Sequence, residues 1–255
     1  MKVHYGVDVV NDSPVLRQAG GGLGRETSVE RLPFTVSTVR TDTQLDKAVT
    51  MRHSAYARHV PDLAERLKAP EACDYDEGSV VLLAESKLDG SPLGTMRIQT
   101  NRYLPLAIEQ SVDLPEWLQD CSLAEATRLG IAEGRIGRVV KTMLFKAYFE
   151  YCREAEVDWM VIGARSPLDR QYEALLFQDV FPGSGFVPLR HAGNIPHRIL
   201  AFEMETAEAR WTAARHPLYH LFCDVRHPDI EVRDAVHGAR DYGDIRLRAY
   251  RENSY

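Results

Sequence analysis

Residues 125–138 contain the side chains and backbone positions best suited to chemistry in this sequence. Glu125 and Arg128 offer a carboxylate and a guanidinium close together, and glycines follow at Gly134 and Gly137. Glycine lets the backbone approach a ligand closely, and the unpaired N–H groups at a helix start favour an anion such as a phosphate. The segment therefore indicates an anion site, although an ordinary tight connection between two elements has the same pattern.

Two further arginines precede this segment. Arg52 lies on the apolar stripe of a predicted helix, in line with Leu45, where a cation is costly unless it meets a carboxylate. Alternatively, its side chain extends along the edge of the stripe toward solvent. Arg97 alternates with Met96 and Ile98 on a predicted strand and points away from them, either toward a site or simply into solvent.

Strands and helices must alternate to position these residues. The apolar patterns predict strands at 34–39, 80–85, 93–100, 122–131, 159–163, 186–190 and 198–203. They predict helices at 42–59, 136–154, 166–180, 208–215 and 217–224. Asp42 and Ser166 are the predicted N-caps of two of these helices. The order predicts an α/β fold, in which helices flank one mixed central sheet.

The chain divides into three predicted parts. Residues 1–33 have little apolar periodicity and a glycine-rich stretch at 20–24, which favours a flexible N-terminal arm over a phosphate loop because no Lys-Ser/Thr pair follows. Residues 34–205 hold the predicted sheet and its helices. Residues 206–255 form a predicted helical extension with a polar tail.

Composition limits the possible partners and location. A net charge of −6 excludes a generally basic surface for nucleic acid. No apolar run approaches the roughly 20 residues of a membrane-spanning helix and no secretory signal is evident, so we expect a cytoplasmic protein without integral membrane association. The four cysteines are far apart and are expected to be reduced. His216, His220 and His227 are not expected to bind a metal, because Pro217 favours a helix start there.

Four short motifs, which follow one another along residues 52–128, resemble those of the GNAT acyltransferases, and in particular of the branch that depends on acyl carrier protein. That branch contains the acyl-homoserine-lactone (autoinducer) synthases and the N-acyl amino acid synthases. The matching residues are the pair Arg52 and Tyr56 on the first helix, the acidic pair Asp74 and Asp76, Gly94-Thr-Met-Arg97, and Glu125-Ala-Thr-Arg128. The resemblance implies a GNAT-like acyltransferase domain over 34–205 and a substrate-binding role for these residues.

Two departures from the autoinducer-synthase pattern favour one of the two families in this branch. The tryptophan that autoinducer synthases carry after the first-helix aromatic is missing, and the stretches 216–220 and 226–230 look more like the N-acyl amino acid synthases. The resemblance thus implies transfer of a fatty acyl group to the amine of an amino acid. An autoinducer synthase that uses S-adenosylmethionine, a CoA-dependent acetyltransferase and a non-enzymatic acyl-binding or carrier-protein-binding module remain the alternatives.

Acyl transfer from a thioester to an amine needs a base and donors for an oxyanion. Glu125 is the candidate base, directly or through a water, unless it only pairs with Arg52 or Arg97. Strict alternation would place Glu125 and Arg128 on opposite faces, so a shared site requires a bulge in this strand. The arginines would then bind the acceptor's carboxylate or order the acidic residues around it.

The acid that protonates the leaving thiolate is less clearly marked. Many GNAT enzymes use a tyrosine before a Gly-Phe landmark, which Gly185-Phe186 resembles here. The matching position is Phe177, and Tyr172 is the possible substitute. A thiol is also a good enough leaving group to need no protein acid.

The acyl donor is expected to be an acyl-phosphopantetheine co-substrate, with no tightly bound cofactor. The residues after Gly137 do not meet the GNAT loop pattern for coenzyme A, which favours acyl carrier protein over acyl-CoA. A local cluster of cations at one helix start suits an acidic carrier protein, although it also fits an ordinary solvated face. The cluster consists of Arg135, Arg138, Lys141 and Lys146, with Gly134 and Gly137 beside it.

Overall fold

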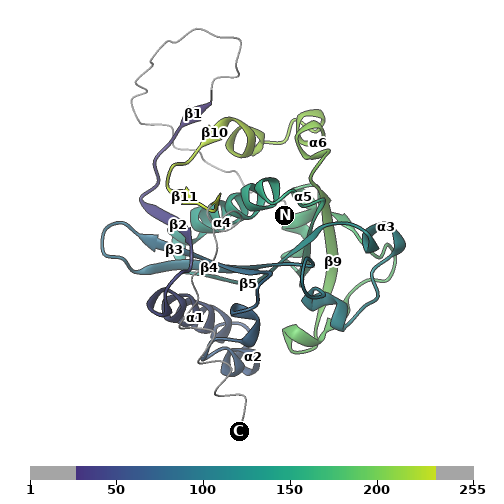
Figure 1. Ribbon diagram of the computed structural model, residues 1–255, viewed down its shortest axis with the longest axis horizontal. Coiled ribbons are helices and arrows are strands. Elements are labelled where there is room, and N and C mark those ends of the chain that lie inside the picture. The colour runs from purple at the N-terminus through teal and green to yellow at the C-terminus, as the bar shows by residue number, and fades with distance from the viewer. Residues whose placement is uncertain (1–26, 234–255) are drawn as a thin grey trace, which may run out of the picture.

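A mixed sheet forms the centre of the computed structural model, which describes residues 27–233 (Figure 1). Within that range the sheet has nine strands. Eight of them follow one another in the order β11 (Ile230–Glu231), β2 (Phe34–Thr38), β3 (Ser79–Ser86), β4 (Pro92–Thr100), β5 (Leu123–Ile131), β6 (Trp159–Ala164), β9 (Ile195–Glu203) and β7 (Gln178–Asp179), while β8 (Val187–Leu189) pairs with β9. The predicted α/β class is confirmed.

Helices cover both faces of the sheet (Figure 1). α4 (Gly134–Glu154) and α6 (Ala207–Ala213) lie on one face, and α1 (Asp42–Ala57) and α2 (Pro61–Arg66) lie on the other. Thr41 caps α1 by accepting a hydrogen bond from the Gln44 amide, so the prediction of Asp42 as N-cap was wrong by one position. Shorter helical segments are η1 (Ala72–Asp74), η2 (Ala107–Gln110), α3 (Glu116–Gln119), α5 (Asp169–Ala174), η3 (Arg190–Ala192) and η4 (His220–Asp224).

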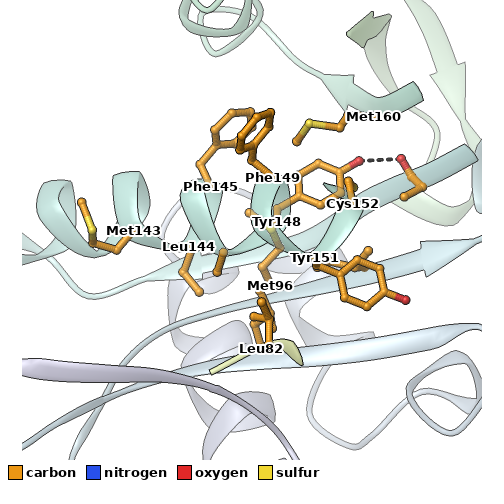
Figure 2. Packing of buried hydrophobic residues seen from close by; sticks show 14 of the residues in the cluster. Leu82, Met96, Met143, Leu144, Phe145, Tyr148, Phe149, Tyr151, Cys152 and Met160 are labelled. Atoms are coloured by element: carbon orange, nitrogen blue, oxygen red, sulfur yellow. Dashed lines mark hydrogen bonds between the residues drawn. The ribbon is translucent and has the colours of Figure 1, made fainter. Parts of the chain in front are cut away.

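The main hydrophobic core lies between α4 and the sheet. Figure 2 shows Leu144 of α4 above Met96 and Leu82 of the strands below, while Phe145 and Phe149 lie on the other side of the helix, near Met160. The Tyr148 hydroxyl donates to the Ala124 carbonyl. α4 packs so closely on β4 that a Cβ on Gly94 would lie 2.6 Å from a Val140 methyl carbon. This packing holds the start of α4 beside the ends of β4 and β5.

The helix predicted over 166–180 is shorter than expected. α5 begins only at Asp169, so Ser166 is not its cap, and it ends at Ala174. Leu176 then takes a positive φ of 71°, which breaks the helix, and β7 turns back to pair with β9. The burial of Phe177 in the core stabilises this turn, an effect that local helix propensity does not report.

The segments at either end of the described range contact one another. β1 (Ser28–Val29) pairs in parallel with β10 (Val225–Arg226), and β11 pairs in parallel with β2. Asp229 accepts hydrogen bonds from the Leu32 amide, from Lys87 and from Arg31. The extension after residue 205 thus adds a strand to the main sheet. Most of the predicted arm (residues 1–26, with its glycines) and of the tail (234–255) lies outside the described residues.

Two further findings concern the whole described range. None of its helices combines the length and the hydropathy that a membrane-spanning segment requires. All four cysteines fall within it, and each has a free thiol.

Candidate active site

A bulge in β5 places Glu125 and Arg128, two of the candidate site residues, on one face of the sheet. Arg97 of β4 pairs with Thr127, but Thr95 pairs with Gly130, so Met96 alone lies opposite Arg128 and the residue after it. Arg128 has a φ of 56°, which turns its side chain to the face that carries Glu125. The bulge that a shared site for Glu125 and Arg128 would require is therefore present.

Three arginines on this face hold two carboxylates in what we call the arginine cluster: Arg52, Arg97, Arg128, Glu71 and Asp74. Arg52 donates two parallel hydrogen bonds of 2.9 Å to Asp74. Arg128 grips Glu71 in the same way at 2.6 and 2.7 Å, and Arg97 contacts both carboxylates at 3.1 Å. The cluster ties α1 and the loop before β3 to the centre of the sheet.

Electrostatics within the cluster favour the ionised carboxylates. Burial raises the pKa of Asp74, but the hydrogen bonds and charge of Arg52, with the charge of Arg97, outweigh burial and leave that pKa below its ordinary value. The pKa of Glu71 is lowered in the same way, mainly by Arg128. The three arginines are therefore paired with Glu71 and Asp74, which agrees with the second of their two predicted roles, ordering acidic residues.

The acidic partners differ in part from the predicted pair. Asp74 is in the arginine cluster with a fully buried side chain, whereas Asp76 is not a member. Its place is taken by Glu71, which the sequence analysis missed. The sequence signal that could have identified Glu71 is the spacing Glu71-x-x-Asp74. These two residues form a capping box, in which the Glu71 amide donates to the Asp74 side chain.

Glu125 is fully buried without a guanidinium partner. Its Oε2 atom accepts a hydrogen bond of 3.1 Å from the Ile108 amide, and its Oε1 atom accepts none. Burial raises the pKa of Glu125 to about 7, against the smaller lowering effects of the Ile108 amide and the Arg97 charge. Arg52 and Arg97 pair with the other two carboxylates instead, so Glu125 is poised between its acid and base forms near neutral pH.

His191, at η3, is the group that faces the unpaired oxygen of Glu125. Its Nε2 atom lies 3.6 Å from Glu125 Oε1, and its Nδ1 atom lies 3.1 Å from the Ala107 carbonyl, which requires the proton on Nδ1. Burial, with the nearby charge of Arg128, lowers the pKa of His191 to about 4. The imidazole is thus neutral and presents a lone pair to Glu125. No sequence motif indicated His191, because it follows a short strand in an irregular segment.

A pocket of about 250 Å³ opens where β5 and β6 separate. The two strands pair only from Leu123 to Ala126 and from Trp159 to Ile162, and beyond this point their backbones line opposite sides of the pocket. Thr127 and Arg128, at the bulge, are among its walls. Glu125 itself does not line the pocket, so it can act there only through an intermediate.

Tyr172 and Tyr56 also line this pocket. Burial, assisted by the neighbouring phenol of Tyr56, raises the pKa of Tyr172 to about 12, so its hydroxyl is protonated at neutral pH. Tyr172 packs against Phe145 and Phe177 on its other side. The structure therefore places the proposed substitute acid in the pocket, while Phe177 is part of the core.

The cations predicted to bind the acyl donor differ in where they lie: two are exposed, one lines the pocket and one is buried. Arg135 and Arg138 are exposed on the first turns of α4, and Lys141 lines the pocket while donating a 2.6 Å hydrogen bond to Gln171. Lys146 is wrongly assigned to this cation cluster, since it is fully buried and donates to the carbonyls of Leu221 and Val225 in the C-terminal extension.

The two glycines of the loop differ. Gly134 has a φ of 86° and nothing within 4 Å of its Cβ position, so its backbone is open to a ligand. At Gly137 a Cβ would lie 1.9 Å from the Ala132 carbonyl oxygen, which makes this glycine a requirement of the turn into α4. The backbone that Gly137 approaches closely is therefore that of Ala132 in the same chain, and this contact alone explains the glycine.

The three histidines weighed as metal ligands are separated in the structure. His216 bonds to the Ala174 carbonyl, His220 to Asp224, and His227 lies 3.0 Å from the Lys146 ammonium. Within residues 27–233 no three His, Cys, Asp or Glu side chains come together as a metal site would require.

The strand order, the bulge of β5 and the pocket between separating strands define a GNAT-like fold, as the sequence motifs predicted. Among solved structures, FeeM, an N-acyl amino acid synthase from uncultured soil microbes, superposes with a TM-score of 0.53 and 16% identity over 71% of this chain and 96% of FeeM. At this identity the similarity establishes the fold.

Other comparisons gave weaker or no matches. BjaI, a CoA-dependent acyl-homoserine lactone synthase, gives a TM-score of 0.49 at 13% identity over 80% of this chain and 98% of its own. A GNAT-family acetyltransferase from Staphylococcus aureus gives 0.45 at 12% identity over 67% and 99%. A scan against protein-family models produced no match, and neither did a search of curated proteins.

Proposed function

We propose that the protein is an N-acyltransferase that moves a fatty acyl group from a thioester to the amine of an amino acid. The observation that carries the proposal is the bulge of β5, which brings Glu125 and Arg128 to one face beside the pocket between β5 and β6. FeeM, which has the same fold, is an N-acyl amino acid synthase, and this supports the class of acceptor.

The reaction makes one bond and breaks one. The neutral amine nitrogen attacks the thioester carbonyl carbon, the C–N bond forms, and the C–S bond breaks with its electron pair leaving on sulfur. The amine gives up one proton to a base, and the thiolate takes up one proton to become a thiol. A backbone N–H freed by the bulge is a suitable donor to the oxyanion of the tetrahedral intermediate.

Glu125 is the proposed base and Tyr172 the proposed acid. Glu125 receives the amine proton through a water, because its side chain is buried two residues from the pocket wall at Thr127. Its raised pKa of about 7 makes it a stronger base than an ordinary carboxylate. Tyr172 lines the pocket with its proton in place and can donate it to the thiolate.

The proposed donor is an acyl group on the phosphopantetheine arm of acyl carrier protein, in the cytoplasm. Arg135 and Arg138 would contact the acidic carrier, while Lys141 and the open backbone at Gly134 lie along the path of the arm to the pocket. No tightly bound cofactor takes part in this chemistry.

The proposal is tested by incubating the purified protein with acyl carrier protein or CoA thioesters and a mixture of amino acids. We expect thiol release matched by an N-acyl amino acid with a free carboxylate, detected by mass spectrometry. An acyl-homoserine lactone with methylthioadenosine, formed only with S-adenosylmethionine, would identify an autoinducer synthase instead. If no thioester gives thiol release with any acceptor, the proposed enzyme is rejected. Binding of acyl carrier protein without turnover would then identify a binding module, and absence of both turnover and binding would reject both readings.

A further inference from the structure

The pocket between β5 and β6 is lined by cations without a carboxylate. Four of its lining residues carry a guanidinium or ammonium group, and none is an aspartate or glutamate. The four are Arg58, Arg128, Lys141 and Arg165. In a chain with a net charge of −6, this local excess of positive charge favours an anionic substrate group.

Three of these four cations are already engaged. Arg128 is held by Glu71, and Lys141 donates to Gln171. Arg58 donates to the Ile131 carbonyl at 2.7 Å and to the Ser54 carbonyl at 3.3 Å. The Arg165 guanidinium makes no hydrogen bond or ion pair with any residue in 27–233.

The backbone of Arg165 is fixed although its side chain has no partner. Arg165 follows the last residue of β6, and its carbonyl accepts a hydrogen bond of 3.2 Å from the Asp169 amide at the start of α5. The residue is half-buried in the pocket wall, where partial desolvation strengthens an ion pair with a ligand.

His197 gives this end of the pocket a second suitable feature. Its Nδ1 atom lies 2.6 Å from the Ile195 carbonyl, which requires the proton there and leaves Nε2 with a lone pair. Burial, with a contribution from the charge of Arg165, lowers the pKa of His197, so the imidazole is neutral at neutral pH. The Nε2 lone pair can accept a hydrogen bond from an amine held beside it.

From this arrangement we infer that Arg165 binds the carboxylate of the acceptor and so restricts the enzyme to amino acids. The inference rests on the proposed N-acyl transfer and deepens it. The planar guanidinium can donate two parallel hydrogen bonds to a carboxylate. The sequence had suggested this role for the arginines of the arginine cluster, which pair with Glu71 and Asp74 instead.

The test compares acceptors that differ only in the carboxylate, with a saturating acyl thioester. Suitable pairs are leucine with 3-methylbutylamine and phenylalanine with 2-phenylethylamine. We expect the unaltered enzyme to prefer the amino acids, and Arg165→Gln to raise their KM about 10- to 100-fold, as loss of a charge-assisted hydrogen-bonded pair implies. The rate with the amines should stay the same, and Arg165→Lys should restore part of the preference.

Arg170→Gln is the matched control, since it removes the same charge from an exposed position of α5. Its selectivity should equal that of the unaltered enzyme, and thermal unfolding should show that all variants are folded. Unchanged selectivity in Arg165→Gln, or a raised KM for the thioester alone, would overturn the inference while leaving the proposed function intact. Failure of the unaltered protein to release thiol with any acceptor would reject the proposed function itself.

Discussion

Asp74 and Glu125 are buried carboxylates on the same face of the sheet, yet their surroundings differ. Asp74 meets two guanidinium groups and stays ionised, because paired charges offset the cost of leaving water. Glu125 meets one amide and a neutral imidazole, so burial dominates and its proton is held up to about pH 7. The first arrangement is suited to holding structure, and the second to exchanging protons.

We expect the rate of acyl transfer to rise with pH through about 7, because a base must be ionised and the pKa of Glu125 is about 7. Glu125→Gln should lower kcat by about 100-fold or more and remove this rise. The measurement is kcat/KM against pH with a thiol-release assay. Glu116→Gln, at an exposed position of α3, is the control. An unchanged rate in Glu125→Gln would remove Glu125 as the base.

Glu125 should also make stability depend on pH. Its pKa is raised by folding from 4.5 to about 7, so the folded state binds more protons than the unfolded state between these values. The free energy of unfolding should therefore fall as pH rises through about 7. Urea unfolding at pH 5 to 8 would show this slope, and Glu125→Gln should flatten it. A slope that persists in the variant must belong to another group.

Removing one carboxylate from the arginine cluster should be costly. Asp74→Asn removes the carboxylate that Arg52 binds with two hydrogen bonds and leaves the buried guanidinium only its 3.3 Å contact with Glu71. Breaking a buried pair in this way costs about 3–5 kcal/mol. Denaturant unfolding measures the loss. Glu65→Gln, whose partner Lys68 is also exposed, should leave unfolding unchanged. Equal stability of the two variants would show that the cluster does not hold α1 on the sheet.

At the scale of elements, periodicity predicted most strands and helices because their apolar faces are buried where the pattern places them. α4 and β6 are the clearest cases, since their apolar residues form the two sides of one core. The bulge of β5 was predicted only as something that a shared site for Glu125 and Arg128 would require. The positive φ of Arg128 depends on how β5 pairs with β4, and a single strand's sequence does not show that pairing. The early end of α5 was missed for the same reason: β7 forms by pairing with β9.

The site was predictable to the extent that its residues lie on regular elements. Arg52 was found because a charge on the apolar face of a helix is unusual, and Arg97 and Glu125 were found through motifs on two strands. Glu71 and His191 lie on short irregular segments, where no period distinguishes inward from outward positions. Which carboxylate each arginine binds depends on the three-dimensional arrangement and cannot be read from the sequence. The same holds for Arg165, whose side chain has no partner within residues 27–233.

Gly137 allows a sharp test of how α4 is joined to β5. Alanine normally stabilises a helix interior by about 1 kcal/mol relative to glycine. Here the new Cβ would lie 1.9 Å from the Ala132 carbonyl oxygen, so Gly137→Ala should instead lower the melting temperature. Val139→Ala, at an exposed position of α4, is the control. A more stable Gly137→Ala variant would mean that the turn can rearrange freely.

At the scale of the whole molecule, charge is unevenly distributed. The chain carries −6 overall, yet Arg135 and Arg138 are exposed at the start of α4, beside the pocket that Lys141 lines. The net charge excludes a generally basic surface, but it leaves room for the proposed local docking site at the start of α4. Under the proposed function, Arg135 and Arg138 favour docking of the acidic carrier protein beside this pocket.

Binding of acyl carrier protein should therefore weaken as salt is raised. Reversing the charges in Arg135→Glu with Arg138→Glu should weaken it by about 10-fold or more at low salt, mainly through slower association. Surface plasmon resonance at several salt concentrations measures both effects. Arg102→Glu, at an exposed position after β4, is the control. Equal losses in both proteins would indicate a general charge effect and no local docking surface.

The pairing of β11 with β2 has a consequence for the synthesis of the chain. The Leu32 amide donates to Asp229, 197 positions later. Within residues 27–233 the outer edge of β2 is covered by β11, which a ribosome makes almost 200 residues after β2. Until then the nascent chain exposes an open strand edge, which is a template for association with other chains. Closure of this edge is therefore a late, long-range step, and in the interval before it the nascent chain is most exposed to association with other chains.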